Sequence, residues 1–128
     1  MDTQCIHIDL SQHPELWTVG HEYDFGGGLY GQRFQVTQTF TAINTTNVFT
    51  IISGNVKRII NAGGDFEYVS NVRLNFPYCD TANISTNGGI FSMPQVDQGD
   101  LKIYGKTNSA SALTFKYDVW FLYEKTSS

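Results

Sequence analysis

The stretch that decides the fold is EYDFGGGLYGQRF, which occupies residues 22–34. Four of its residues are glycines and four are aromatic. Glycine reaches backbone conformations that cost other residues energy, so the run predicts a tight chain reversal and not a helix. It leads directly into residues 32–43, whose polar and apolar residues alternate.

Residues 32–43 alternate between polar and apolar side chains. Phe34, Val36, Phe40 and Ala42 fall on one face, and arginine, glutamine and threonines fall on the other. Alternation with a period of two predicts a half-buried antiparallel strand. Gln38 is the exception, because it is a polar residue in the middle of the apolar face.

Residues 113–123 form the second clear pattern. Every odd-numbered residue from Leu113 to Tyr123 is apolar or aromatic. The opposite face is polar at first and then carries Trp120 and Leu122. A monomer rarely exposes two such residues together, so we expect them to be covered, either by the amino-terminal segment or by a neighbouring subunit.

The remaining chain predicts further strands and turns. Asn61–Asp65 is a turn signal, residues 66–76 are extended, residues 80–89 form a long polar loop, and residues 90–93 are a strand that Pro94 stops. No sustained helical periodicity is found. The sequence therefore predicts an all-β fold, a jelly-roll-like antiparallel β-sandwich of about seven to nine strands. We expect a single domain over residues 1–128, with residues 1–16 as an arm or inter-subunit connection.

Charge and composition disfavour several classes of function. The net charge is −4, which does not suit binding to nucleic-acid phosphates. No apolar run is long enough for a membrane span, and residues 1–10 lack the pattern of a signal peptide. We therefore expect neither a nucleic-acid partner nor membrane insertion.

The spacing of the cysteines and histidines does not predict a metal site. Cys5 and Cys79 are too far apart in sequence to form a metal-binding pair, and whether they form a disulfide is left open. His7, His13 and His21 do not have the spacing of zinc ligands. We expect no metal and no cofactor.

Catalytic signatures are weak. Glu22 and Asp24 are two residues apart, as paired carboxylates on one strand face would be, but solvated edge residues are the better interpretation. The three glycines precede a strand and not a helix, so they do not predict a phosphate-binding loop. No nucleophile motif is present. The sequence predicts a protein that is not an enzyme.

Aromatic and amide side chains in loops suggest a binding role instead. Tyr78, Asp80, Asn83 and Asn87 surround the longest loop. Sugars are held by aromatic faces together with amides and carboxylates that fix their hydroxyls, so these four are the candidate ligand-binding residues. The alternative is that the aromatic residues cap the core and the amides form turns.

Several segments resemble small β-rich tip domains of bacteriophage tail fibres. They are residues 19–26 and 28–34, the strand ISGNVKR at residues 52–58, and the closing pair at residues 101–104 and 115–125. The chain departs from that pattern in having three consecutive glycines where many members carry an Asp-Gly-Lys-Pro turn. The resemblance implies a homotrimer in the virion, made in the host cytoplasm, that contacts other virion proteins and recognises a bacterial surface glycan or protein.

Three functions stay open. The first is a receptor-binding or adhesion domain, the second is a capsid- or tail-decoration protein, and the third is a carbohydrate-binding module or lectin. In a trimer, Gln38, Trp120 and Leu122 are the candidate interface residues, since three Gln38 side chains could hydrogen-bond across the symmetry axis. A single buried glutamine bonded to backbone explains Gln38 equally well.

Overall fold

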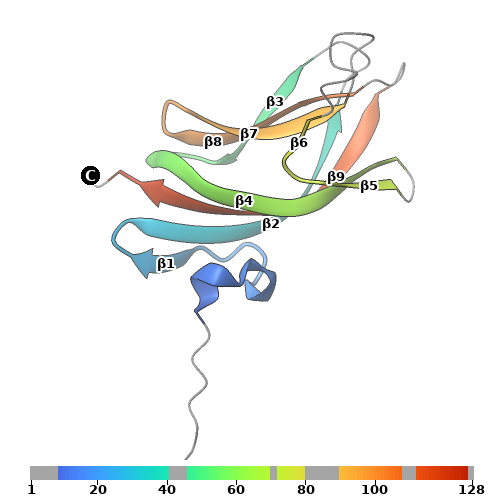
Figure 1. Cartoon of the computed structure of the whole chain (residues 1–128). Coiled ribbons are helices and arrows are strands. Elements are labelled where there is room, and N and C mark those ends of the chain that lie inside the picture. The colour runs from blue at the N-terminus through green and yellow to red at the C-terminus, as the bar shows by residue number, and fades with distance from the viewer. Residues whose placement is uncertain (1–8, 41–45, 70–71, 80–89, 108–111, 127–128) are drawn as a thin grey trace, which may run out of the picture.

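The computed structural model describes residues 9–40, 46–69, 72–79, 90–107 and 112–126. Within them, nine strands form two antiparallel sheets, which confirms the predicted all-β sandwich (Figure 1). Two 3₁₀ turns precede the strands, η1 (Leu10–Gln12) and η2 (Pro14–Leu16). The strands are β1 (Tyr23–Gly26), β2 (Leu29–Phe40), β3 (Asn47–Ile52), β4 (Val56–Val69), β5 (Val72–Asn75), β6 (Tyr78–Cys79), β7 (Phe91–Asp97), β8 (Asp100–Lys106) and β9 (Leu113–Lys125).

The five-stranded sheet has the order β1-β2-β9-β4-β5, and the four-stranded sheet has the order β3-β8-β7-β6. Strand β2 pairs with β9 along its whole length, and β3 pairs with β8. The chain passes from β2 to β3 and from β8 to β9 between sheets. The pairs β2–β9 and β3–β8 thus follow each other along the chain but lie in different sheets, an arrangement typical of jelly-roll-like sandwiches.

The core lies between the sheets and is dominated by β9. Its inward side chains Phe115, Tyr117, Val119, Phe121 and Tyr123 are at most 3% exposed. They pack against Phe40, Phe66, Phe76, Leu101 and Ile103 from both sheets. The odd-numbered apolar face predicted for residues 113–123 is confirmed.

The glycine run forms the predicted reversal. Gly26, Gly27 and Gly28 have φ of +87°, +65° and +85°, in the left-handed region that favours glycine. Gly27 and Gly28 make the turn between β1 and β2, and Gly26 lies at a bulge in the pairing of these two strands. The carboxylate of Asp24 accepts a hydrogen bond from the Gly26 amide at 2.9 Å and supports the bulge.

The turn predicted at Asn61–Asp65 is wrong, because these residues lie inside β4. Gly63 faces the Trp120 ring so closely that a Cβ atom there would lie 2.5 Å from Trp120 Cζ2. A Cβ atom on Gly64, whose φ is +108°, would lie 2.2 Å from the carbonyl oxygen of Asp118. These glycines allow β4 to approach β9 and do not reverse the chain.

Two other boundaries differ from the prediction. Residues 66–76 are not one strand, since β4 ends at Val69 and β5 returns antiparallel to it from Val72. Strand β7 also continues past Pro94 to Asp97. Its neighbour β6 pairs only with Phe91 and Ser92, so beyond them β7 has β8 as its one described neighbour. A proline is tolerated at such an edge.

The amino-terminal segment, residues 9–17, covers part of the outer face of the five-stranded sheet. Trp17 is only 2% exposed, and its indole nitrogen donates to the Leu10 carbonyl at 2.7 Å. Its ring lies 6.0 Å from Trp120 in an edge-to-face arrangement. A Cβ atom on Gly31 of β2 would lie 2.4 Å from Trp17 Cη2. Each indole thus lies over a glycine of a neighbouring strand.

Candidate ligand-binding site

Of the four residues predicted to bind a ligand, the structure describes one. Tyr78 lies in β6, and its half-buried ring packs edge-on to Phe66 of the core, with the ring centres 6.4 Å apart. Its contacts are those of a core residue. Asp80, Asn83 and Asn87 lie outside the described residues, so a binding loop there stays a prediction.

The three candidate interface residues have different surroundings. Gln38 is half-buried and lies opposite Phe115 in the pairing of β2 with β9. Leu122 is 9% exposed, and it lines a crevice with Trp120 and with Ser11, Gln12 and Pro14 of the amino-terminal segment. That segment provides the cover expected for Trp120 and Leu122, so no second subunit is needed to bury Leu122. A subunit contact at these residues stays a prediction.

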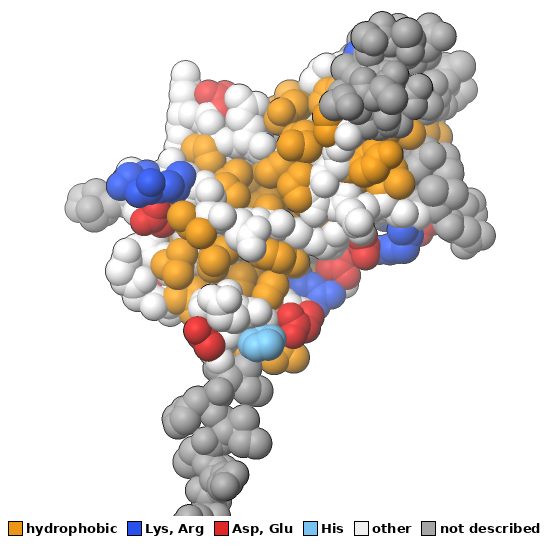
Figure 2. Space-filling view, viewed as in Figure 1, with side chains coloured by type: hydrophobic (Ala, Val, Ile, Leu, Met, Phe, Trp, Pro, Cys, Tyr) orange, Lys and Arg blue, Asp and Glu red, His pale blue; other side chains and the backbone are white. Residues whose placement is uncertain are grey.

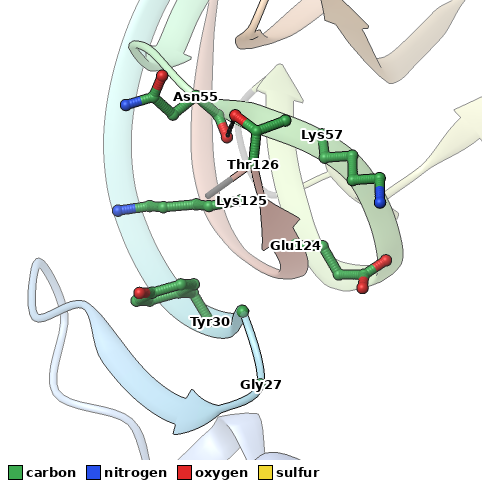
Figure 3. A pocket seen from close by; sticks show the side chains of 8 residues that line it. Gly27, Tyr30, Asn55, Lys57, Glu124, Lys125 and Thr126 are labelled. Carbon is green, nitrogen blue, oxygen red and sulfur yellow. Dashed lines mark hydrogen bonds between the residues drawn. The ribbon is translucent and has the colours of Figure 1, made fainter. Parts of the chain in front are cut away.

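A hollow of about 900 Å³ opens at one end of the sandwich (Figure 3). Three segments that are distant in sequence meet there: the turn before β2, the start of β4 and the end of β9. Its lining is mostly polar and consists of Gly27, Gly28, Tyr30, Asn55, Lys57, Glu124, Lys125 and Thr126.

Backbone hydrogen bonds fix the rim of the hollow. The Lys125 amide donates to the Gly28 carbonyl at 3.0 Å, and the Thr126 amide donates to the Asn55 carbonyl at 2.8 Å. Asn55 has a φ of +65°, a conformation that costs most residues energy and that asparagine tolerates better than most. The Val56 amide, which donates to the Gly99 carbonyl at 2.9 Å, holds the segment in place. The Asn55 side chain is thus presented by a constrained backbone.

Lys125 is held at the centre of the hollow. Its ammonium donates to Glu22 Oε1 at 2.9 Å and lies 4.5 Å from the centre of the Tyr30 ring. Tyr30 in turn stacks on Tyr123 with ring centres 6.1 Å apart, and the Tyr123 hydroxyl donates to Glu22. Contacts with Lys125 and Tyr123 therefore occupy both the Tyr30 ring and the Glu22 carboxylate.

Glu22 differs from the solvated residue expected from the sequence. Partial burial by itself raises its pKa, but the hydrogen bonds from Lys125 and Tyr123 outweigh that effect, and the pKa lies below the usual value. Asp24 has a different role, since its side chain binds the Gly26 amide. The two carboxylates thus serve separate structural contacts.

The polar tips at the hollow are mainly hydrogen-bond donors. In Figure 3 the side chains of Asn55, Lys125 and Tyr30 extend toward the same side, one above the other. Lys57 is exposed, whereas Glu124 is paired with Arg58. Lys125 pairs with Glu22, and Glu124 pairs with Arg58, which lies outside the lining. The net positive charge of the region is therefore that of Lys57, whose side chain points away from Asn55, Lys125 and Tyr30 in Figure 3. The hydrogen-bonding groups on the other side suit a hydroxylated or acidic ligand.

The sequence did not predict this hollow. Its residues come from positions near 30, 55 and 125, and only the fold brings them together. The one local signal is Gly54-Asn55, a pair that favours positive φ, and both residues adopt it.

Metal ligands do not cluster in the described parts of the chain. His13 Nδ1 lies 3.0 Å from Glu15 Oε2, and the His21 ring packs edge-on to Tyr23 at 4.5 Å. His7 lies outside the described residues. Among the residues described, no helix has the length and apolar character needed to cross a membrane.

Comparisons with known proteins found no match. No family model matches the chain, and neither the curated proteins nor the solved structures include a match to it. The fold defines the class of the protein as an antiparallel β-sandwich.

Proposed function

We propose that the chain is a non-catalytic receptor-binding domain of a virion, which recognises a glycan or protein on the bacterial surface. The observation that carries the proposal is the polar hollow at the end of the sandwich, with the Asn55 amide, the Lys125 ammonium and the Tyr30 hydroxyl directed to one side (Figure 3). Donors held by rigid strands recognise hydroxyl and carboxylate groups with little loss of side-chain freedom.

The mode of binding follows from the neighbours of Tyr30. Lys125 lies over its ring and Tyr123 stacks against it, so the ring is occupied by contacts within the chain. A ligand therefore meets the hollow through hydrogen bonds and charge and not by stacking on Tyr30. The resemblance to phage fibre tips supplies the virion setting and the homotrimer of this proposal.

The test is binding of the purified chain to whole bacterial cells and to an array of bacterial glycans. Lys125→Ala and Asn55→Gly are expected to lower binding at least several-fold, and Asn55→Gly keeps the positive φ. Lys116→Ala is the matched control, because Lys116 is also a lysine of β9 but lies at the other end of that strand. Equal binding by all variants, or no binding to cells or glycans, would contradict the proposal.

A decoration role on a capsid or tail is the second candidate. It is favoured by the outer face of the four-stranded sheet, where Val48 is 56% exposed and Phe91 packs edge-on to Tyr104. Such a surface suits contact with protein better than contact with a sugar. Attachment of the chain to capsids, without binding to cells, would support this role.

A further inference from the structure

The outer faces of the two sheets differ. On the five-stranded sheet, residues 9–17 cover the apolar half around Trp120, and ion pairs occupy the other half. Figure 2 shows acidic and basic side chains alternating along the side where β5 lies. That face therefore has both its own cover and its own charge pairing.

The outer face of the four-stranded sheet carries a row of apolar side chains. Val48, Tyr104 and Met93 are direct cross-strand neighbours on β3, β8 and β7, and the Phe91 ring lies 5.7 Å from Tyr104. Among the described elements, the larger contacts of β7 and β8 are with the strands of their own sheet and, for β7, with β4 across the core. No described element makes a contact of that size from the outer side of this row.

Strand β3, at the edge of this row, carries no charge and no proline, two of the features that protect edge strands. The other edges are short: β1 and β5 have four residues each and β6 has two. Strand β3 has six residues, none of them charged and none a proline, and β8 is its one described neighbour. A bulge opposite Leu101 limits its regular part to Asn47–Thr50. Exposed edges of this kind pair readily with other strands.

We propose that the β3 edge and the apolar row form a contact between two copies of this chain, with β3 antiparallel to β3 of the second copy. A second copy of the chain fits this edge because β3 is uncharged, so its pairing with an antiparallel copy brings no like charges together. With Phe49 opposite Phe49 of the other copy, Val48 lies opposite Thr50 on the outer face. The two apolar rows then join across a two-fold axis in a sheet of eight strands.

This contact is separate from the proposed trimer and from the proposed ligand site. If only the two-fold contact forms, the particle contains two chains. If a three-fold contact forms as well, it contains six. In either case, disrupting β3 halves the mass, so a failure of the β3 contact can be distinguished from a failure of the trimer or of ligand binding.

The test is the molar mass of the full chain by light scattering over a range of concentrations. Thr50→Glu places a carboxylate on the exposed edge, and Lys102 on β8, which lies directly opposite, favours it within the folded chain. Thr39→Glu is the control, because Thr39 is an exposed threonine on the outer face of β2. Circular dichroism verifies that both variants are folded.

The wild type and Thr39→Glu are expected to contain two or six chains, and Thr50→Glu half as many. Val48→Glu, opposite Tyr104 in the same row, is expected to act like Thr50→Glu. A wild type that is monomeric at every concentration would overturn the proposal. So would a trimer, or a mass that folded Thr50→Glu and Val48→Glu leave unchanged.

Discussion

At the scale of single residues, two glycines determine how closely the outer face can pack. Gly31 lies under Trp17, and Gly63 lies under Trp120. In both cases the neighbouring atom belongs to an indole ring that contacts the other indole, so neither ring can shift independently. The absence of a side chain at these positions is what allows the rings to lie on the sheet.

Gly31→Ala is expected to lower the free energy of unfolding by about 1–3 kcal/mol, since the new methyl overlaps both Trp17 and Phe25. Urea denaturation measures the loss. In a Trp17→Leu background the same substitution is expected to cost less, because the clashing ring is gone. An equal cost in both backgrounds would show that Trp17 is not the limiting contact.

The carboxylate of Asp118 links β9 to β2. Arg33 Nε and Nη2 donate to its two oxygens at 2.9 Å each. The hydrogen bonds from Arg33 lower the pKa of Asp118, partial burial opposes them, and Gln35 and Arg73 add to the lowering. Because the folded state binds this proton less readily than the unfolded chain, the stability from this group is complete above the ordinary value of 3.8. It is lost as pH falls through the lowered pKa.

Asp118→Asn is therefore expected to cost about 1–2 kcal/mol at pH 7. The difference from the wild type should narrow as the pH falls below 3.8, when the wild-type carboxyl becomes protonated. Urea denaturation at pH 7 and at pH 2–3 measures both values. Asp97→Asn, which removes an exposed pair with Lys102, is the control and should cost about 0.5 kcal/mol or less. A stability difference between Asp118→Asn and the wild type that does not change with pH would contradict a lowered pKa for Asp118.

At the scale of elements, residues 9–17 form a cap that is attached to the sheet mainly by the side chain of Trp17. Trp17 contacts Tyr23 and Phe25 of β1 as well as Trp120 of β9, and its indole nitrogen bonds back to Leu10. The two 3₁₀ turns contain no buried residue of their own. Arg33 of β2 adds a hydrogen bond to the Glu15 carbonyl at 3.5 Å, so Trp17 is the main attachment of the segment and not its only one.

Trp17→Ala is expected to cost about 3–5 kcal/mol in urea denaturation. Since the chain has only two tryptophans, the fluorescence of the variant comes from Trp120 alone. Its emission is expected to shift to longer wavelength as water reaches the ring. Leu16→Ala is the control, because Leu16 is 51% exposed and should change stability by about 0.5 kcal/mol or less. An unshifted Trp120 emission would show that the cap does not need Trp17.

Elements with a local cause were predictable, and those with a tertiary cause were not. Three consecutive glycines specify the β1–β2 turn, and strict alternation specifies β9. Gly63 and Gly64 carry the same local signal as a turn, but they serve contacts with β9 that the sequence near them cannot show. Pro94 stays within β7 because β6 is short, which is also a property of a different segment. The ligand hollow was missed for the same reason.

At the scale of the whole molecule, one buried hydrogen bond connects the two sheets. The hydroxyls of Tyr117 on β9 and Ser92 on β7 lie 2.6 Å apart, and Ser92 is fully buried. Burial raises the pKa of Tyr117 far above its usual value, so this hydroxyl stays protonated and available for the bond.

Ser92→Ala is expected to destabilise the fold by about 1–3 kcal/mol, because it leaves the Tyr117 hydroxyl without this partner in the core. Tyr117→Phe removes the other half of the pair. The double variant should cost less than the two single variants together, with a coupling of about 1 kcal/mol in denaturation experiments. Additive costs would show that the bond does not couple the sheets.

The place of β9 has a consequence for how the protein is made. Strands β2 and β4 both pair with β9 and not with each other, and paired residues such as Arg33 and Asp118 are 85 positions apart. During synthesis, β2 and β4 therefore leave the ribosome well before β9, the strand that lies between them in the folded sheet. Distant pairing of this kind slows folding and prolongs the exposure of unpaired strands. A chain truncated before residue 113 should thus be retained by chaperones or aggregate, and not form a smaller native sheet.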